Sequence, residues 1–337
     1  MNALPQSADV VIVGAGFAGA ATAWALARRG VTNAIVLERE VALGRYASGR
    51  AAGLGRQIAE DDHTTALTVR GAQLIRELPV WQPSGGLYSF DDAAHADAYA
   101  ERAKRFEIAT VMGSPDELIA PGWPQLAQLR SVRVMHVPSD GTIDVAALLA
   151  VLTKNLRIEL GCPVQRLDGP TVMTSRGAIA ARVVVDASGA WAGELVGEPL
   201  QAFKRHVFVL DDDNAPPTPW LWHLGAGEMY MRRDGAAVLA SPCDSALSSA
   251  GHQDPDLVGE AHLRKLLDEA DSMLAGAPIT RRWACQRAFA EDRKMKLGRD
   301  SNRPWLVWAA GLGGHGATAA PAVGERVANA VIEALSS

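Results

Sequence analysis

The chain has 337 residues, with 33 basic and 38 acidic side chains, a net charge of −5 and 48% hydrophobic residues. This composition is typical of a folded globular protein of about two domains, and it excludes a disordered chain and a general electrostatic attraction to nucleic acid. No apolar stretch reaches the ~20 residues of a membrane span, and residues 1–8 lack a signal-peptide pattern, so we expect a cytoplasmic protein with no integral membrane segment.

The first predicted element is a buried parallel strand over residues 9–13. It runs into the glycine-rich turn Gly14-Ala-Gly16-Phe-Ala-Gly19, and a helix over about 18–29 follows. A second strand over 34–37 ends at Glu38. Strand, GxGxxG turn, helix, strand and terminal acid in this order predict a dinucleotide site.

Each residue of this unit has an expected role. Gly14 allows the tight turn, Gly16 lets the backbone approach a pyrophosphate, and Gly19 lets the helix pack closely on the strand. The helix N-terminus offers free N–H groups and a partial positive charge to the phosphates. Glu38 is placed to accept hydrogen bonds from ribose hydroxyls.

Three later segments are also rich in small residues, and each follows a predicted strand. Residues 44–56 are rich in glycine, alanine and serine, and the predicted strand 182–186 ends in Ala187-Ser188-Gly189-Ala-Trp191. The predicted strand 305–308 leads into the glycine loop 311–318 and a terminal helix over about 320–335, with Pro321 in its first turn. Small residues at this density permit close approach of the backbone to a large flat ligand.

The remaining elements show no nucleotide-site features. Helices are predicted over Ala93–Phe106 and Asp256–Leu274 and over 145–156, the last with Asp144 as N-cap. Strands are predicted over 85–90, 207–210, 228–232 and 236–239.

Several motifs in order resemble the D-amino-acid oxidase-like superfamily of flavoproteins, and most closely its D-arginine dehydrogenase group. They are Ala47-Ser-Gly-Arg50-Ala-Ala, Met229-Tyr230, Leu239-Ala-Ser-Pro242, Trp283-Ala and Gly313-Gly314. The resemblance implies an α/β fold (α+β overall), in which a glutathione-reductase-type, Rossmann-like FAD-binding domain is interleaved with a substrate domain of mixed or antiparallel sheet. We expect residues 1–74, 138–199 and 290–337 to form the FAD-binding domain and residues 75–137 and 200–289 the substrate domain.

The resemblance and the local motifs together predict which residues form the FAD site. The residues expected to bind the cofactor are Gly14, Gly16, Phe17, Ala18, Gly19, Glu38, Arg39, Ser48, Gly49, Arg50, Ala52, Gly53, Leu54, Val164, Ala187, Ser188, Gly189, Trp191, Gly311, Gly313, Gly314, His315, Gly316, Ala317 and Thr318. No metal is expected. The FAD is expected to be non-covalent, although some sarcosine-oxidase relatives carry a flavin-linked cysteine at what looks like the position of Cys285.

The substrate site is expected to need one fixed arginine and few acid-base groups. The resemblance makes Arg287 the anchor of a substrate carboxylate, places Tyr230 and Arg205 in the pocket, and offers Arg56 as a second carboxylate contact. His315 is expected at the pyrimidine edge of the flavin, acting through its backbone or packing. Each has an alternative structural role, as a surface arginine or a core tyrosine.

The chain departs from the D-arginine dehydrogenases where they carry a histidine and a tyrosine, because Leu54 and Ala59 stand there. The acidic run Glu60-Asp61-Asp62 could meet a cationic side chain, but a solvated turn is the preferred interpretation. The expected reaction is FAD-dependent oxidation of the Cα–N bond of a small D- or N-substituted amino acid to an imine. Sarcosine- or glycine-oxidase-like activity, 2-hydroxy-acid oxidation, an NAD-dependent enzyme and a non-catalytic flavoprotein remain alternatives. The electron acceptor and the oligomeric state stay open.

Overall fold

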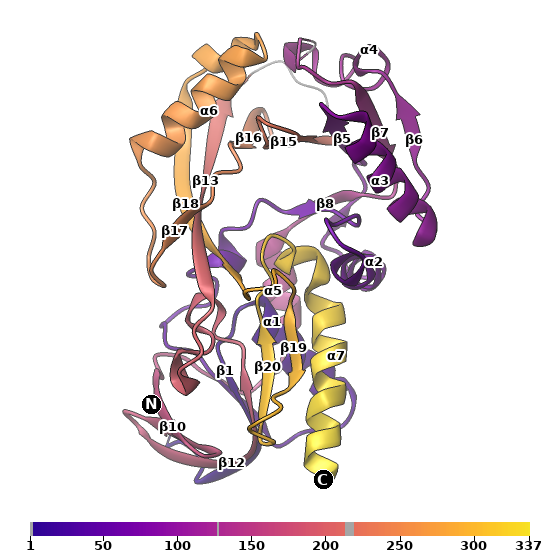
Figure 1. The fold of residues 1–337 in the computed structure, drawn as a ribbon. Helices are drawn as coiled ribbons and strands as arrows, with labels where there is room; N and C mark the ends of the chain where they lie inside the picture. Colours follow the sequence, from indigo (N-terminus) through magenta and orange to yellow (C-terminus); the bar gives the residue numbers. More distant parts are fainter. Residues whose placement is uncertain (1–2, 127, 213–218) are drawn as a thin grey trace.

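The computed structural model describes residues 3–126, 128–212 and 219–337. Two sheets stand one above the other, as Figure 1 shows, and the chain crosses between them several times. The lower region holds both termini. The predicted α/β class with a mixed sheet is confirmed.

The lower sheet is the parallel sheet that the βαβ pattern predicts. Its parallel part has the order β20-β12-β1-β2-β9, and β10, β11 and β19 add antiparallel pairs. The bounds are β1 Ser7–Val13, β2 Ala34–Leu37, β9 Ile158–Glu159, β10 Val164–Asp168, β11 Thr171–Thr174, β12 Gly177–Asp186, β19 Lys296–Arg299 and β20 Leu306–Ala310. Strands β1, β2 and β20 and the second half of β12 are buried on both faces, which explains their continuous apolar sequences.

The upper sheet is antiparallel except where β14 pairs with β5. Its order is β17-β13-β16-β15-β14-β5-β7-β6, with β18 on the other side of β13. The bounds are β5 Gly86–Phe90, β6 Val111–Gly113, β7 Arg133–Val137, β13 Gln201–Asp211, β14 Trp220–Leu224, β15 Met229–Asp234, β16 Ala237–Ser241, β17 Ala246–Ser248 and β18 Ile279–Phe289. A small sheet of β3 Leu54–Gly55, β4 Trp81–Gln82 and β8 Gly141–Ile143 lies on the path between the regions.

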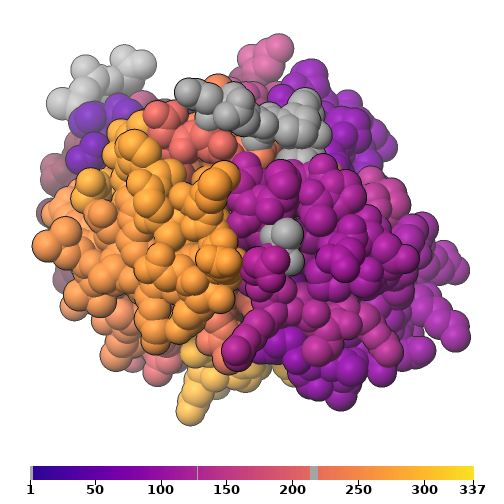
Figure 2. Space-filling view, turned by 90° about the horizontal axis from the view of Figure 1, so that it is seen from above, coloured from indigo at the N-terminus to yellow at the C-terminus, as the bar shows by residue number. Residues whose placement is uncertain are grey.

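The helices pack on these sheets. They are α1 Phe17–Arg28, α2 Asp62–Arg76, α3 Ala93–Arg105, α4 Pro115–Leu118, α5 Val145–Thr153, α6 Leu257–Glu269 and α7 Gly316–Ser336. Asp144 caps α5 by accepting from Ala147 N at 2.9 Å, as the sequence predicts, whereas α2 had no predicted counterpart. Seen from above in Figure 2, the orange segment that includes α6 lies beside the purple to magenta segment that includes α3 and α4.

The predicted start of the terminal helix was wrong. The helix begins at Gly316 and not near Ala320, so Pro321 lies inside it and not in its first turn. The reason is close packing. A Cβ on Gly71 of α2 would lie 2.0 Å from Thr318 O, and one on Gly324 would lie 2.3 Å from Ala21 O of α1. Small residues at these crossings let α7 pack tightly on α1 and α2 from its first turns.

Candidate active site

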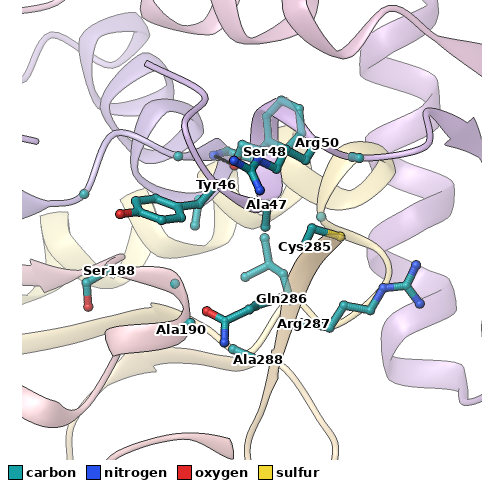
Figure 3. Close-up of a pocket in the computed structure, with 18 of the residues that line it drawn as sticks. Tyr46, Ala47, Ser48, Arg50, Ser188, Ala190, Cys285, Gln286, Arg287 and Ala288 are labelled. Carbon is teal, nitrogen blue, oxygen red and sulfur yellow. Dashed lines mark hydrogen bonds between the residues drawn. The ribbon is translucent and has the colours of Figure 1, made fainter. Parts of the chain in front are cut away.

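One cavity of 380 Å³ lies between the lower sheet and the lower ends of β13 and β18. In Figure 3, Tyr46 and Ser188 lie toward one end, Arg287 lies at the other, and Cys285 lies between them. Every residue expected to bind FAD lines this cavity except Gly19 and Gly49. Those two glycines allow close backbone contacts next to the cavity wall. A Cβ on Gly19 would lie 1.9 Å from Gly14 O, and one on Gly49 would lie 2.0 Å from Gly44 O.

The first βα turn has the geometry of a phosphate site. Gly14 has a φ of +98°, and N-cap Gly16 of α1 has no side-chain capping bond. Phe17 N donates to Ser48 Oγ at 2.8 Å, which ties the turn to the segment that follows β2. The start of α1 therefore faces the cavity with its positive dipole end.

Glu38 stands where a ribose would bind. Its carboxylate accepts from Ala15 N at 2.9 Å and from Glu40 N at 2.9 Å, which holds it at the end of β2. Each oxygen keeps lone pairs for ribose hydroxyls, because a carboxylate accepts about four hydrogen bonds.

Aromatic and cationic side chains close this end of the cavity. The guanidinium of Arg39 lies 4.1 Å from the ring centroid of Trp191, and the Tyr46 and Trp191 rings meet edge to face at 4.8 Å. Tyr46 also donates to Glu40 Oε1 at 2.8 Å. On the neighbouring strand end, Asp186 accepts from Ser188 and from Gly193 N, and so shapes the turn after β12.

Glycines line much of the cavity wall, so a large ligand can come into close contact with the backbone. Gly14, Gly16, Gly311, Gly313 and Gly314 come from two distant segments, and side chains at these positions would extend into the cavity or into its wall. A Cβ on Gly313, for example, would lie 2.5 Å from the Phe289 ring. The dipole end of α1, the ribose acceptor Glu38 and this glycine-lined wall lie along a single cavity, so the residues present fit an FAD.

A second cavity of 400 Å³ adjoins the first and shares with it Arg56, Trp222, Arg287 and residues 311–315. Side chains along each strand of the upper sheet point alternately to its two faces, and this alternation decides which of them face the second cavity. Arg205 pairs with Cys285 across β13 and β18, and Arg287 lies diagonally beside them on the same face. Tyr230 reaches this face through the register of β15, β16 and β13, and it lines the first cavity at its border with the second.

Arg287 and Arg205 differ in exposure but share the lack of a carboxylate partner. Arg205 is 8% exposed, and its Nε and Nη1 have no hydrogen-bond partner. Arg287 is half-buried, and its Nη1 would lie 3.3 Å from a Cβ on Gly314, so it lies against the glycine loop. Within the described residues, no carboxylate oxygen comes within 4.0 Å of a nitrogen of either guanidinium.

Arg56, Glu60 and His315 form a hydrogen-bonded group in the wall. Glu60 Oε1 accepts from Arg56 Nη2 at 2.8 Å, Glu60 Oε2 lies 2.8 Å from His315 Nε2, and the Arg56 guanidinium lies 4.0 Å from the Trp222 ring centroid. Burial works against the charge of Glu60, but Arg56 and His315 lower its pKa well below the usual value. Burial lowers the pKa of His315.

The acidic run keeps the solvated turn that the sequence predicts, and its members also have partners. Glu60 is an exposed bend residue whose side chain also lines the second cavity. Asp61 caps α2, and Asp62 pairs with Arg102 and Arg105 of α3. The side chain of His315 contacts Glu60. The spacing of Arg56 and Glu60, four residues apart, can be read from the sequence, but the contact of Glu60 with His315, 255 residues away, cannot.

The two cysteines near the cavities are buried thiols. Burial raises the pKa of Cys285, and it raises the pKa of Cys243 to about 12. Cys285 lines the first cavity and Cys243 the second. In the described part of the chain no group of three or more His, Cys, Asp or Glu side chains is placed to hold a metal ion.

No helix among the described residues is both long and apolar enough to span a bilayer.

Comparison with known proteins gives a family match over nearly the whole chain: the model of the FAD dependent oxidoreductase family (DAO) matches residues 9–330. The mitochondrial sarcosine dehydrogenase of Homo sapiens is 27% identical over 247 residues, 62% of this chain and 26% of that protein. The chain thus spans about a quarter of the length of that curated relative.

Solved structures share the fold. The L-proline dehydrogenase from P. horikoshii has a TM-score of 0.88 at 22% identity, with 98% of this chain and 94% of that chain covered. The glycine oxidase from Geobacillus kaustophilus has a TM-score of 0.81 at 22% identity, with 98% and 95% covered.

Proposed function

Because the chain belongs to the family of FAD-dependent oxidoreductases, we propose that it oxidises the Cα–N bond of a small amino acid or N-substituted amino acid to an imine. The observation that carries the proposal is Arg287, an arginine without a carboxylate partner among the described residues, at the junction of the cofactor cavity and the second cavity. The names of the similar proteins, which include a sarcosine dehydrogenase and a glycine oxidase, agree with an amine substrate.

FAD bound in the first cavity would supply the two-electron acceptor, which takes a hydride from the substrate Cα. We propose that it is held without a covalent bond, since burial raises the pKa of the Cys285 thiol and so disfavours the reactive thiolate. Acid precipitation of the protein tests this point. A colourless pellet and a yellow supernatant are expected, and yellow colour in the pellet would show a covalent link.

Arg287 would bind the substrate carboxylate through two parallel hydrogen bonds of its planar guanidinium. Its position against Gly314 would hold the substrate beside the loop 311–316. Tyr230, which is buried and stacks at a tilt on Trp222 with 5.1 Å between ring centroids, would give the pocket one rigid wall.

Proton chemistry in this site is limited by its hydrogen bonds. Glu60 is already engaged by both Arg56 and His315. His315 is engaged as well, because its Nε2 lies 2.8 Å from Glu60 Oε2 and Arg56 Nη2 lies 3.0 Å from its Nε2 and 3.3 Å from its Nδ1. We therefore assign no general base, and we expect the substrate to react with its amine already neutral.

An anaerobic screen of the purified holoenzyme tests the reaction class. D- and L-amino acids, sarcosine, glycine and 2-hydroxy acids are offered in turn, and bleaching of the visible flavin band identifies the electron donor. Reduction by amines supports the proposal. Reduction by hydroxy acids alone, or by none of these compounds, contradicts it.

The anchor is tested separately by Arg287→Met and Arg287→Lys. Loss of a bidentate, charge-assisted pair should weaken substrate binding by about 10- to 100-fold in the first variant, and the lysine should restore only part of it because an ammonium cannot replace the fork. Arg282→Gln is the matched control, since Arg282 lies on the same strand but pairs with Glu260 on the other face. Unchanged affinity in Arg287→Met removes the anchor assignment.

A further inference from the structure

Arg205 is a buried guanidinium to which the proposed function gives no partner. Its side chain is more than nine-tenths buried beside the second cavity, and neither Nε nor Nη1 has a hydrogen-bond partner. A buried guanidinium without a partner is costly, because its charge has lost hydration and gained no hydrogen bonds. Such a group is retained where a ligand completes it.

The acidic side chains around Arg205 are engaged elsewhere. Asp244 accepts from the backbone N of His206 at 2.9 Å and lies 2.7 Å from its Nδ1, and Glu228 accepts from Trp222 Nε1 at 2.8 Å. Both carboxylates stabilise the charged form of Arg205 from a distance, and neither forms an ion pair with it within 4.0 Å. The structure therefore keeps Arg205 charged without neutralising it by contact.

Arg287 is a second arginine in the wall of the second cavity, and the register of β13 and β18 places it close to Arg205. Arg205 lies opposite Cys285, and Arg287 is two residues further along the same strand on the same face. Diagonal neighbours of this kind are about 7–8 Å apart. The other arginines and the lysine of the cavity have partners: Arg56 pairs with Glu60, Lys204 pairs with Asp256, and the exposed Arg293 lies over the rings of Phe203 and Phe289.

We infer that the substrate carries two carboxylates: one binds Arg287 beside the glycine loop, and the other binds Arg205. The class is an amino dicarboxylate, either an acidic amino acid or an N-carboxyalkyl amino acid. This inference rests on the proposed function for the reacting Cα–N bond. The single carboxylate of a simple amino acid, paired with the fork of Arg287, would leave Arg205 as a buried net charge. A second carboxylate that accepts hydrogen bonds from Arg205 Nε and Nη1 neutralises that charge.

The space agrees with this class. The second cavity measures 400 Å³, and it is bounded by Phe203, Phe289 and Trp222 as well as by the two arginines. It exceeds what glycine or sarcosine needs, and its charged wall does not suit a long apolar side chain. A substrate with a short, charged second arm fits both the volume and the charge.

The test measures binding to the oxidised holoenzyme by unreactive carboxylates, so that it does not depend on turnover. Acetate, propionate and butyrate are compared with malonate, succinate and glutarate by perturbation of the flavin spectrum and by calorimetry. In the wild type, at least one dicarboxylate should bind about 10- to 100-fold more tightly than the monocarboxylate from which it differs by one added carboxylate. Equal affinity in all three pairs would overturn the inference.

Variants separate the two arginines. Arg205→Gln should abolish the dicarboxylate preference and leave monocarboxylate binding unchanged, while Arg205→Lys should keep part of the preference and Arg282→Gln all of it. Equal weakening of both ligand classes by Arg205→Gln would mean that both arginines hold one carboxylate, and would overturn the inference. If Arg205→Gln does not fold, the lysine variant and the wild-type series still decide.

A different result would contradict the assignment of Arg287 as the carboxylate anchor. If Arg287→Met binds monocarboxylates as the wild type does, the carboxylate anchor of the proposed function is wrong. The Arg205 result is then read from the dicarboxylate series alone.

Discussion

Replacing Gly14 by alanine tests whether the first βα turn, and no other feature of the fold, determines flavin binding. The residue lines the cavity and has a φ of +98°. An added Cβ would lie 2.6 Å from Ala187 O and 3.2 Å from Ser188 Cα, so the ends of β1 and β12 would have to separate. Both displaced groups belong to the cavity wall, and the damage should therefore fall on cofactor affinity.

The magnitude follows from two costs. A residue with a side chain in a left-handed conformation costs about 1–2 kcal/mol. Displacing packed backbone by several tenths of an ångström costs about 1–3 kcal/mol more. The first cost lowers the stability of the apoprotein and holoprotein alike, so only the second, the displacement of the cavity wall, bears on the cofactor. A loss of about 1–3 kcal/mol corresponds to a decrease in FAD affinity of about 5- to 150-fold.

Gly30→Ala is the matched control. Gly30 has a φ of +80°, but a Cβ there would meet nothing within 4 Å, so this variant carries the backbone strain without the clash. The assay is a titration of each apoprotein with FAD, followed by flavin fluorescence, with thermal unfolding of the apoproteins recorded in parallel. We expect Gly30→Ala to lose only stability and Gly14→Ala to lose flavin affinity. Equal FAD affinity in the two variants would refute the reasoning.

Two further predictions concern the carboxyl groups of Asp140, which is buried, and of Glu60, which is exposed but contacts two cationic side chains. Asp140 is fully buried, and burial raises its pKa from 3.8 to about 6, so its proton stabilises the fold below about pH 4 and this stability is lost as the pH rises through 6. The shift of about two units corresponds to ~3 kcal/mol. Asp140→Asn keeps an acceptor for Gln57 and a partner for Tyr88, and the difference in unfolding free energy between it and the wild type should change by that amount between pH 4 and 7; a constant difference would contradict this. Glu60→Gln removes the carboxylate that raises the pKa of His315, and should lower that pKa further, as followed by NMR of the ring protons with His315→Gln for assignment; an unchanged His315 titration would show that the pair is not coupled.

Much of the lower region could be predicted because its determinants are local. The strand over 9–13, the glycine turn and Glu38 follow one another in the sequence, and their hydrogen bonds join near neighbours along the unit. The start of α7 could not be predicted in this way. It depends on the contact of Gly71 with Thr318 and of Gly324 with Ala21, which are tertiary contacts between three helices.

Glu60 shows the same limit within the site. A run of three acidic residues at the start of a helix is usually solvated, and Glu60, Asp61 and Asp62 all keep contact with solvent. The sequence does not show the contact of Glu60 with His315, because only the loop before α7 brings His315 to within 2.8 Å across 255 residues of sequence.

The sequence by itself therefore predicted a dinucleotide cofactor, and the resemblance of its motifs to a flavoprotein superfamily predicted FAD. A dinucleotide is bound by backbone groups and small residues at fixed short spacings, and such spacings can be read directly from the chain. Only the tertiary structure decided which arginines of the proposed substrate site lack a carboxylate partner. Arg205 and Arg287 become neighbours through the pairing of β13 with β18, and whether a guanidinium has a carboxylate partner depends on side chains from several distant strands. Burial and pairing of a charge are properties of the packed molecule, so no local pattern in the sequence contains them.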